Sequence, residues 1–200
     1  MRSRKSSKNQ LKITSLEIMH LVNELQKFIG KRIDNVYQNS GIFLKISSKN
    51  GIEIRPDVIF VSSGFEFEKH TNFSQILRKH IKNRKIISIE QHKFDRIVII
   101  KFNDYALISE LFHNGNIILC DSSMMIISAL EQRHWKDRSL VPWEKYKFPE
   151  GIDITKENEF LSGVKREEKI VSFLVKSGLG SYAESVLERC EINKLKGCKD

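Results

Sequence analysis

Hydrophobic and polar positions along residues 86–130 follow a pattern that predicts antiparallel β-structure. Five short runs rich in Ile and Val are separated by segments rich in Asn, Asp, Gly and Ser. Runs of this length, bounded by residues that favour turns, are typical of the strands of a meander. The five predicted strands are Ile86–Gln91, Ile97–Phe102, Ala106–Leu111, Ile117–Asp121 and Ile126–Leu130.

The chain before this meander predicts a helix, further strands and a second, shorter helix. Thr14 and Glu17 have the spacing of a capping box, and apolar residues recur at helical spacing after them, so a helix is expected over Ser15–Ile29. Asn50-Gly51 indicates a tight hairpin, because both residues tolerate positive φ. The other predicted elements are strands at Arg32–Gln38, Ile42–Ser47, Ile52–Arg55 and Val58–Ser62 and a helix at Phe73–Ile81.

The period of the apolar residues becomes helical towards the C-terminal end. Lys165–Cys190 therefore predicts two helices joined by a tight turn at Gly178 and Gly180. The N–H groups that open the second helix of such a pair can bind an anion; the alternative is that the turn only positions two packed helices. The preceding segment, Glu131–Gly151, is irregular and aromatic, and we expect it to pack back on the sheets rather than to form a base-stacking platform.

These patterns together predict an α+β fold in three parts. Residues 13–150 are expected to form an antiparallel, sandwich-like β-domain with flanking helices, and residues 155–200 a helix–turn–helix unit. Residues 1–12 carry five Lys and Arg and no acid, and they lack apolar periodicity. We expect them to form a disordered basic tail.

Composition excludes several classes of protein. No apolar run approaches the roughly 20 residues that span a bilayer, and the N-terminus lacks the apolar segment of a signal peptide, so we expect a cytoplasmic protein without a membrane partner. The three cysteines, Cys120, Cys190 and Cys198, do not have the spacing of metal ligands. Cys120 is expected to be a buried apolar residue. No catalytic triad and no phosphate-binding loop is recognisable, so we expect no cofactor, no metal and no enzymatic activity.

The positive charges are clustered. The net charge is +9, and besides the N-terminal tail the segment 69–89 contains six Lys and Arg and no acid. Such clusters suit a polyanion such as nucleic acid; the alternative is a set of solvated faces in a lysine-rich chain. The candidate phosphate contacts are Arg78, Lys79, Lys82, Arg84 and Lys85, together with the turn glycines Gly178 and Gly180.

Asp95 and Arg96 form an adjacent acid–base pair where the first turn of the meander ends. Neighbouring side chains on a strand point to opposite faces, so the two cannot easily pair with each other. In a structural interpretation, which the residues alone favour, Asp95 caps the turn after His92 and Arg96 pairs with an acid across the sheet. In a functional interpretation, Arg96 binds a phosphate or a base edge with its planar guanidinium. Asp95 then orients Arg96 or accepts from a base amine, and His92 stacks on a base or donates to a phosphate.

Four separated segments carry a resemblance to a known family. They are LVNELQKFIGKRIDNVYQ at Leu21–Gln38, FSQILRKHI at Phe73–Ile81, HKFDRIVIIKF at His92–Phe102 and ELFHNGNIILCD at Glu110–Asp121. In this order and spacing the chain resembles the N-terminal part of the NFACT family of ribosome-associated quality control factors. The glycine turn at Arg166–Arg189 is similar to the helix-hairpin-helix segment of that family.

The resemblance implies both a fold and a function. The family's N-terminal domain has the fold of formamidopyrimidine-DNA glycosylases, a β-sandwich followed by a helix-hairpin-helix unit. Its members bind tRNA and the large ribosomal subunit carrying a stalled peptidyl-tRNA, and they support C-terminal tailing of the nascent chain, which the ribosome catalyses. The Asp-Arg motif, here Asp95–Arg96, is implicated in tRNA engagement, which reverses the preference between the two interpretations. Glu110, Asn114 and Asn116 also match family positions, but turn formation explains them.

The chain also departs from these families. Glycosylases use an N-terminal proline as nucleophile, and the second residue here is Arg2, so we expect no base excision. The family often has Pro-Gly near the end of the first domain, where this chain has Pro142-Trp143. The family's coiled coil and later RNA-binding domain are absent, so the sequence is expected to be part of a longer protein. The alternative function is a DNA-backbone binder with a catalytically inactive glycosylase-like fold. Surface adhesion is disfavoured because no signal peptide is present.

Overall fold

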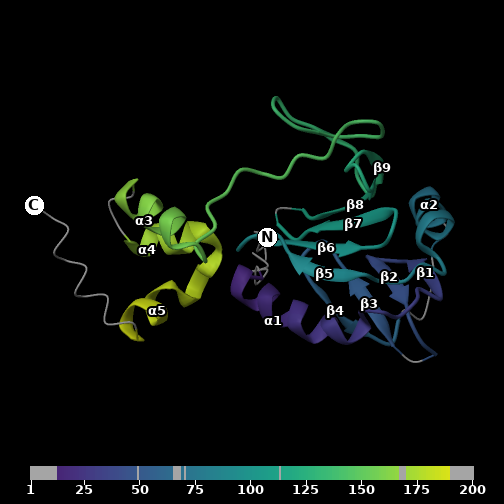
Figure 1. The fold of residues 1–200 in the computed structure, drawn as a ribbon, viewed down its shortest axis with the longest axis horizontal. Helices are drawn as coiled ribbons and strands as arrows, with labels where there is room; N and C mark the ends of the chain where they lie inside the picture. Colours follow the sequence, from purple (N-terminus) through teal and green to yellow (C-terminus); the bar gives the residue numbers. More distant parts are fainter. Residues whose placement is uncertain are drawn as a thin grey trace, which may run out of the picture.

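The computed structural model describes residues 13–48, 50–64, 69, 71–112, 114–166 and 170–189. In this part of the chain two large antiparallel sheets and a two-stranded hairpin are followed by a helical region, which lies beside the start of the first helix (Figure 1). This mixed helical and antiparallel architecture confirms the predicted α+β class. The predicted basic tail, Cys190 and Cys198 lie outside the described residues.

The first helix begins at the predicted capping box. Helix α1 spans Ser15–Leu25 and continues as a short 3-10 turn, η1, over Gln26–Phe28. The Thr14 hydroxyl accepts the Glu17 N–H at 3.2 Å, and the Thr14 N–H donates to the Glu17 carboxylate at 2.7 Å. These reciprocal bonds satisfy two of the backbone groups that a helix start leaves without partners.

The first sheet contains the four strands predicted before the meander, in the order of the chain. Its strands are β1 (Asn35–Gln38), β2 (Ile42–Lys45), β3 (Gly51–Ile54) and β4 (Ile59–Ser62). Helix α2, Asn72–Ile81, packs against β1, and α1 packs against β4. Buried residues of both helices, such as Ile18 and Leu77, join the same core as Ile52 of β3.

The second sheet is the predicted five-stranded meander. Its strands are β5 (Ser88–Gln91), β6 (Ile97–Lys101), β7 (Tyr105–Glu110), β8 (Asn116–Asp121) and β9 (Ile126–Ala129). Alternate residues of β6 face different cores: Val98 joins the core shared with the first sheet, and Ile99 joins a smaller core on the other face. Both faces are covered, which explains why these strands are continuous apolar runs.

The smaller core is closed by the aromatic segment after β9. This segment contains a short hairpin, β10 (Arg133–His134) with β11 (Ser139–Leu140), and Tyr146 is buried against the second sheet. The prediction that the aromatic side chains pack inward is correct for Tyr146. It is wrong for Trp143, which is 87% exposed, because the turn that carries it directs the ring away from the sheet, and for Trp135, which is 49% exposed.

The helical region begins at α3, Glu157–Arg166. This start is close to residue 155, where the unit was expected to begin, and it precedes Lys165, where the apolar period predicted the first helix. The chain continues through α4 (Ile170–Leu174), the irregular segment η2 (Val175–Leu179), the 3-10 turn η3 (Gly180–Tyr182) and α5 (Ala183–Arg189). Its buried residues, Phe173, Leu174, Leu179 and Ala183, pack with Phe94 of the turn between β5 and β6. None of the helices in the described part is long and apolar enough to cross a membrane.

Candidate nucleic-acid site

A tight turn between β5 and β6 presents the Asp95–Arg96 pair. The Asp95 N–H donates to the His92 carbonyl at 3.1 Å, and the His92 N–H donates to the Ile97 carbonyl at 2.9 Å. The Asp95 carboxylate accepts the Arg96 N–H at 2.6 Å. Asp95 therefore stabilises the turn locally, as the structural interpretation proposed, and leaves its other carboxylate oxygen for a further partner.

Gln91 ties this turn to the start of α1. Its side-chain amide donates to two carbonyl oxygens, one of Ser15 and one of Asp95, each at 2.8 Å. A single amide NH₂ group provides two donors, so both are used. The turn that carries Asp95 is thus held against the first turn of a helix that lies 76 residues earlier in the chain.

The Arg96 guanidinium has no acidic partner among the described residues. Its charged end lies 5.9 Å from the centre of the Phe112 ring. Glu110 lies on β7, opposite Ile97, the residue after Arg96. Its carboxylate accepts a hydrogen bond from the Tyr146 hydroxyl at 2.8 Å and forms an ion pair with Arg138. The expectation that Arg96 pairs with an acid across the sheet is therefore wrong, because the carboxylate of Glu110 on the paired strand β7 is already engaged. The turn-forming role expected of Glu110 is wrong for the same reason.

His92 is held by an aromatic contact. Its ring stacks on Phe148 with the centroids 3.8 Å apart and the planes 11° apart. Burial, with a smaller contribution from the Lys93 charge, lowers the pKa of His92 below its usual value. The imidazole is therefore neutral at physiological pH, which favours stacking over a charge-assisted bond to a phosphate.

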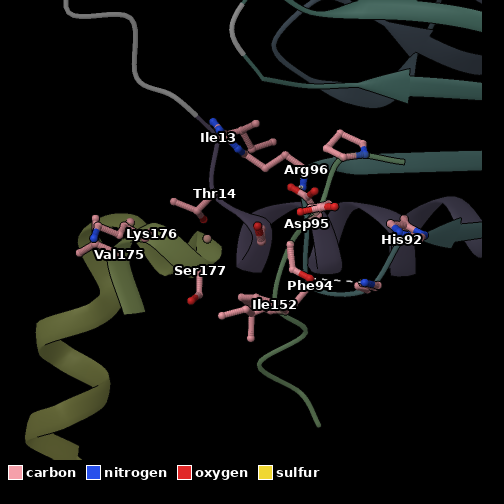
Figure 2. Close-up of a pocket in the computed structure, with 17 residues that line it drawn as sticks. Ile13, Thr14, His92, Phe94, Asp95, Arg96, Ile152, Val175, Lys176 and Ser177 are labelled. Atoms are coloured by element: carbon pink, nitrogen blue, oxygen red, sulfur yellow. Dashed lines mark hydrogen bonds between the residues drawn. The ribbon is translucent and has the colours of Figure 1, made fainter. Parts of the chain in front are cut away.

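A cavity of about 310 Å³ joins this turn to the helical region. Figure 2 shows Asp95 and Arg96 on one side, Lys176 and Ser177 across from them, and Thr14 between the two in this view. The remaining lining residues are Ile13, Ser15, His92, Lys93, Phe94, Pro149, Glu150, Gly151, Ile152, Val175, Gly178 and Gly180. The wall is part apolar and part charged, the composition of pockets that hold small organic groups by a few polar contacts.

The two turn glycines line this cavity, and both have positive φ, +103° at Gly178 and +54° at Gly180. A β-carbon on Gly178 would lie 2.1 Å from the Ser15 hydroxyl oxygen, and one on Gly180 would lie 2.7 Å from a methyl carbon of Thr14. Close approach to α1 thus requires glycine at Gly178 and disfavours any side chain at Gly180. This contact supports the positioning role of the turn.

The basic cluster at the end of α2 and just after it does not belong to the cavity. Arg78 donates from Nε to the Val36 carbonyl at 2.7 Å and lies over the Tyr37 ring, so it is engaged within the fold. Arg84 pairs with Asp104 at 3.1 Å. The other three, Lys79, Lys82 and Lys85, are exposed. The predicted site residues therefore separate into two groups: His92, Asp95, Arg96, Gly178 and Gly180 share the cavity, and the α2 cluster lies elsewhere.

Sequence reasoning missed several residues of the site. Gln91 ends a strand without any motif, and its importance depends on a contact between distant segments. Lys93, Lys176 and Ile152 come from three different segments and meet only in the folded chain. The positive charge of Lys93 and Lys176 was visible, but nothing in the sequence placed the two residues together.

Cys120 does not line the cavity. Cys120 is buried, as predicted, and burial raises the pKa of its thiol to about 12, so the thiolate is scarce at neutral pH. Among the described residues, no group of three or more His, Cys, Asp and Glu is arranged to hold a metal ion.

Solved structures with this fold are known. The chain matches the N-terminal domain of the fibronectin-binding protein PavA from Streptococcus pneumoniae with a TM-score of 0.73 and 24% identity, covering 92% of this chain and 85% of that one. It matches the N-terminal part of the fibronectin/fibrinogen-binding protein from Streptococcus suis with a TM-score of 0.77 and 22% identity, covering 92% and 81%. At these identities the likeness establishes the fold alone.

Sequence relatives are named as ribosome quality control proteins. The archaeal Rqc2 homolog aRqcH of Methanocaldococcus jannaschii is 34% identical over 92% of this chain and 32% of its own length. The NEMF homolog of Drosophila melanogaster, a ribosome quality control complex subunit, is 29% identical over 88% of this chain and 18% of its own length. The chain thus spans about a third, or less, of these relatives.

The family itself is established by a match along nearly the whole chain. Residues 14–200 match the model that describes the NFACT N-terminal and middle domains. The predicted resemblance is confirmed, and the chain belongs to the NFACT family.

Proposed function

We propose that this chain is the tRNA-binding and ribosome-binding region of a ribosome quality control factor, and that it acts on large subunits that carry a stalled peptidyl-tRNA. The observation that carries the proposal is the cavity in which Asp95 and Arg96 face the turn at Gly178 and Gly180. The names of the archaeal and fly relatives support the ribosome quality control role.

The chemistry of the cavity suits part of an RNA chain. Arg96 offers a guanidinium that lacks an acidic partner among the described residues, and a planar guanidinium binds a phosphate or a base edge through two parallel hydrogen bonds. Asp95 offers a carboxylate oxygen that can accept from an exocyclic amine. Ile152 and Val175 supply apolar wall against which a base or sugar can pack. Asp95 and Arg96 are the residues to which we assign tRNA contact.

The proposal includes no catalytic step by this chain. C-terminal tailing of a nascent chain would be catalysed by the ribosome, with this region delivering or retaining tRNA. In this proposal the glycine turn and its helices act as a helix-hairpin-helix unit after a glycosylase-like β-domain, and the site of action is the cytoplasm.

The test compares Arg96→Ala, Asp95→Ala and Arg84→Ala. Arg96→Ala is expected to weaken tRNA binding by about 1–3 kcal/mol, the range for one lost bidentate contact, without changing the melting temperature. Asp95→Ala is expected to act in the same direction and less strongly, because its carboxylate also serves the turn. Arg84→Ala removes the same charge outside the cavity and serves as the matched control. Large-subunit binding should change little in all three variants.

Two results would contradict this proposal. In the first, Arg96→Ala lowers the melting temperature while the folded fraction binds tRNA normally, which would make the pair structural. In the second, the wild-type chain binds duplex DNA of matched charge as tightly as tRNA, which would favour the alternative of a DNA-backbone binder. Fluorescence anisotropy with labelled tRNA and duplex, alongside thermal melts, measures all of these quantities.

A further inference from the structure

The chain contains two tryptophans, and both are exposed. Trp143 is 87% exposed and Trp135 is 49% exposed, whereas Tyr146 of the same segment is 3% exposed. The Trp135 ring is partly covered by Arg138, whose guanidinium lies 5.7 Å from the ring centre. Trp143 is therefore the one large aromatic side chain in the described part of this segment that is almost fully open to solvent.

The backbone at Trp143 makes this exposure more unusual. The Glu144 N–H donates to the Val141 carbonyl at 3.3 Å, so residues 141–144 form a β-turn with Pro142 in its second position. Trp143 holds the third position with φ +71°, where a type II turn favours glycine. A bulky residue at positive φ is uncommon and strained. This chain therefore has a tryptophan where glycine would be easier to accommodate.

The turn is anchored on both sides. The Trp143 N–H donates to the Ile126 carbonyl at 2.9 Å, and the Ile126 N–H donates to the Glu144 carbonyl at 2.9 Å. Two residues on, the Tyr146 N–H donates to the Met124 carbonyl at 2.8 Å. The ring thus projects from a backbone that is already ordered, so binding a partner costs little further backbone entropy.

The charge around Trp143 suits an anionic partner. Residues 131–147 contain five Lys and Arg and three acids. Lys145, two residues from Trp143, is exposed, as are Lys147 and Lys136. Glu144, the next residue after Trp143, is also exposed, but cations outnumber acids in the segment. Proteins use exposed aromatic rings together with nearby cations to stack on unpaired bases while neutralising phosphates.

We propose that Trp143 is an RNA-docking residue that stacks on an unpaired base of the ribosomal RNA in the large subunit. This inference extends the proposed function, on which it rests, to a second surface: Trp143 does not line the cavity assigned to tRNA. A base exposed in a ribosomal RNA loop offers the flat apolar face that the ring lacks among the described residues of its own chain. On this proposal the tryptophan is kept at a strained backbone position, φ +71°, because its ring serves binding and not because it stabilises the fold.

The direct test uses the chain's own fluorescence. Trp135→Phe leaves Trp143 as the single tryptophan, and its emission is followed while a 5′-labelled single-stranded oligoribonucleotide is added and binding is measured by anisotropy. Stacking should quench the Trp143 emission, and a blunt RNA duplex of equal charge should quench it little. An oligoribonucleotide that binds without any change in Trp143 emission would overturn the proposal.

Substitutions at the same position separate stacking from other roles. Trp143→Gly should weaken binding to purified large subunits about tenfold, within the range for losing one base stack, and should melt at or above the wild-type temperature. Trp143→Phe should bind nearly as the wild type does, and Trp143→Leu as weakly as Trp143→Gly. If Trp143→Leu binds like the wild type, the ring docks on an apolar protein surface and the RNA assignment is wrong. A lower melting temperature for Trp143→Gly would show that the ring packs within the fold and would also overturn it.

Transfer RNA binding distinguishes this inference from the proposed function. Trp143→Gly should leave tRNA affinity unchanged, and Arg96→Ala should leave large-subunit affinity unchanged. If the wild type binds large subunits through Trp143 but fails to bind tRNA, the cavity assignment fails and this inference stands. If Arg96-dependent tRNA binding is present and Trp143→Gly binds subunits normally, only this inference fails.

Discussion

The turn at Asp95–Arg96 and the basic end of α2 carry similar signals in the sequence and differ completely in the folded chain. The turn lines a cavity, and its arginine lacks an acidic partner in the described part of the chain. The α2 region packs against β1 and β9, and there Arg78 donates to a backbone carbonyl and Arg84 pairs with Asp104. Concavity, rather than the density of positive charge, distinguishes the candidate site from a solvated face.

The largest effect expected from this contrast comes from the cavity wall. Gly178→Ala places a methyl group 2.1 Å from the Ser15 hydroxyl oxygen at φ +103°, so the helical region must shift away from α1. Left-handed strain and overpacking together should lower the free energy of unfolding by about 2–4 kcal/mol. Urea unfolding measures this change.

A control exists elsewhere in the cavity wall. Gly151→Ala adds the same methyl group where the nearest atom, a carboxylate oxygen of Asp95, is 4.0 Å away, and it should be nearly neutral. Ser15→Gly should partly rescue Gly178→Ala by removing the obstructing hydroxyl. Equal losses for both glycines, or no rescue, would mean that the close approach to α1 does not determine the position of the helical region.

The second effect concerns the attachment of the turn to α1. Gln91→Leu removes both amide donors and leaves the carbonyls of Ser15 and Asp95 without these partners. We expect a loss of about 1–3 kcal/mol in unfolding free energy and weaker tRNA binding, because Arg96 is then less firmly held. Gln75→Leu, an exposed position on α2, is the control and should alter neither urea unfolding nor tRNA anisotropy.

The third effect tests the basic face itself. Lys82→Ala removes an exposed charge beside α2, so it should change tRNA affinity by only a few tenths of a kcal/mol. If Lys82 contacts a phosphate, the variant should also reduce the slope of log K against log salt by about 1. Salt titrations of tRNA binding measure both values. A loss as large as that of Arg96→Ala would place the main RNA contact on α2 and reverse the contrast drawn above.

The smallest effect is a pH dependence shared by one histidine in each region. Burial lowers the pKa of His92 and of His80, with added repulsion from Lys93 in the first case and from Lys79 and Arg84 in the second. The unfolded chain, with histidine pKa values of about 6.5, then binds protons more readily than the folded chain, so stability is full above about pH 6.5 and falls as the pH drops through the lower folded values. His92→Phe and His80→Phe should each reduce this slope in urea unfolding measured across that range. A slope unchanged in both variants would assign the pH dependence to other groups.

The regular elements of both sheets were predictable because local patterns determine them. The capping box at Thr14 and the five apolar runs each depend on neighbouring residues, and the structure places an element at every one. The family's Asp-Arg motif also singled out two cavity residues. Gln91 and Lys176 were not predictable, because their roles arise from contacts between segments that are distant in the sequence. The aromatic segment that contains Trp143 was predicted to pack back on the sheets, but the turn at residues 141–144 leaves the Trp143 ring exposed.

Because the cavity walls come from distant segments, the cavity can bind a ligand only late in the synthesis of the chain. The walls come from residues 13–15, 92–96, 149–152 and 175–180. During synthesis the last of these segments leaves the ribosome only after nearly the whole described chain has been made. Until the helical region docks on α1, the Asp95 turn lies open on one side. Ligand binding in this cavity would therefore report completed folding, and a nascent β-domain of this chain would lack the closed site.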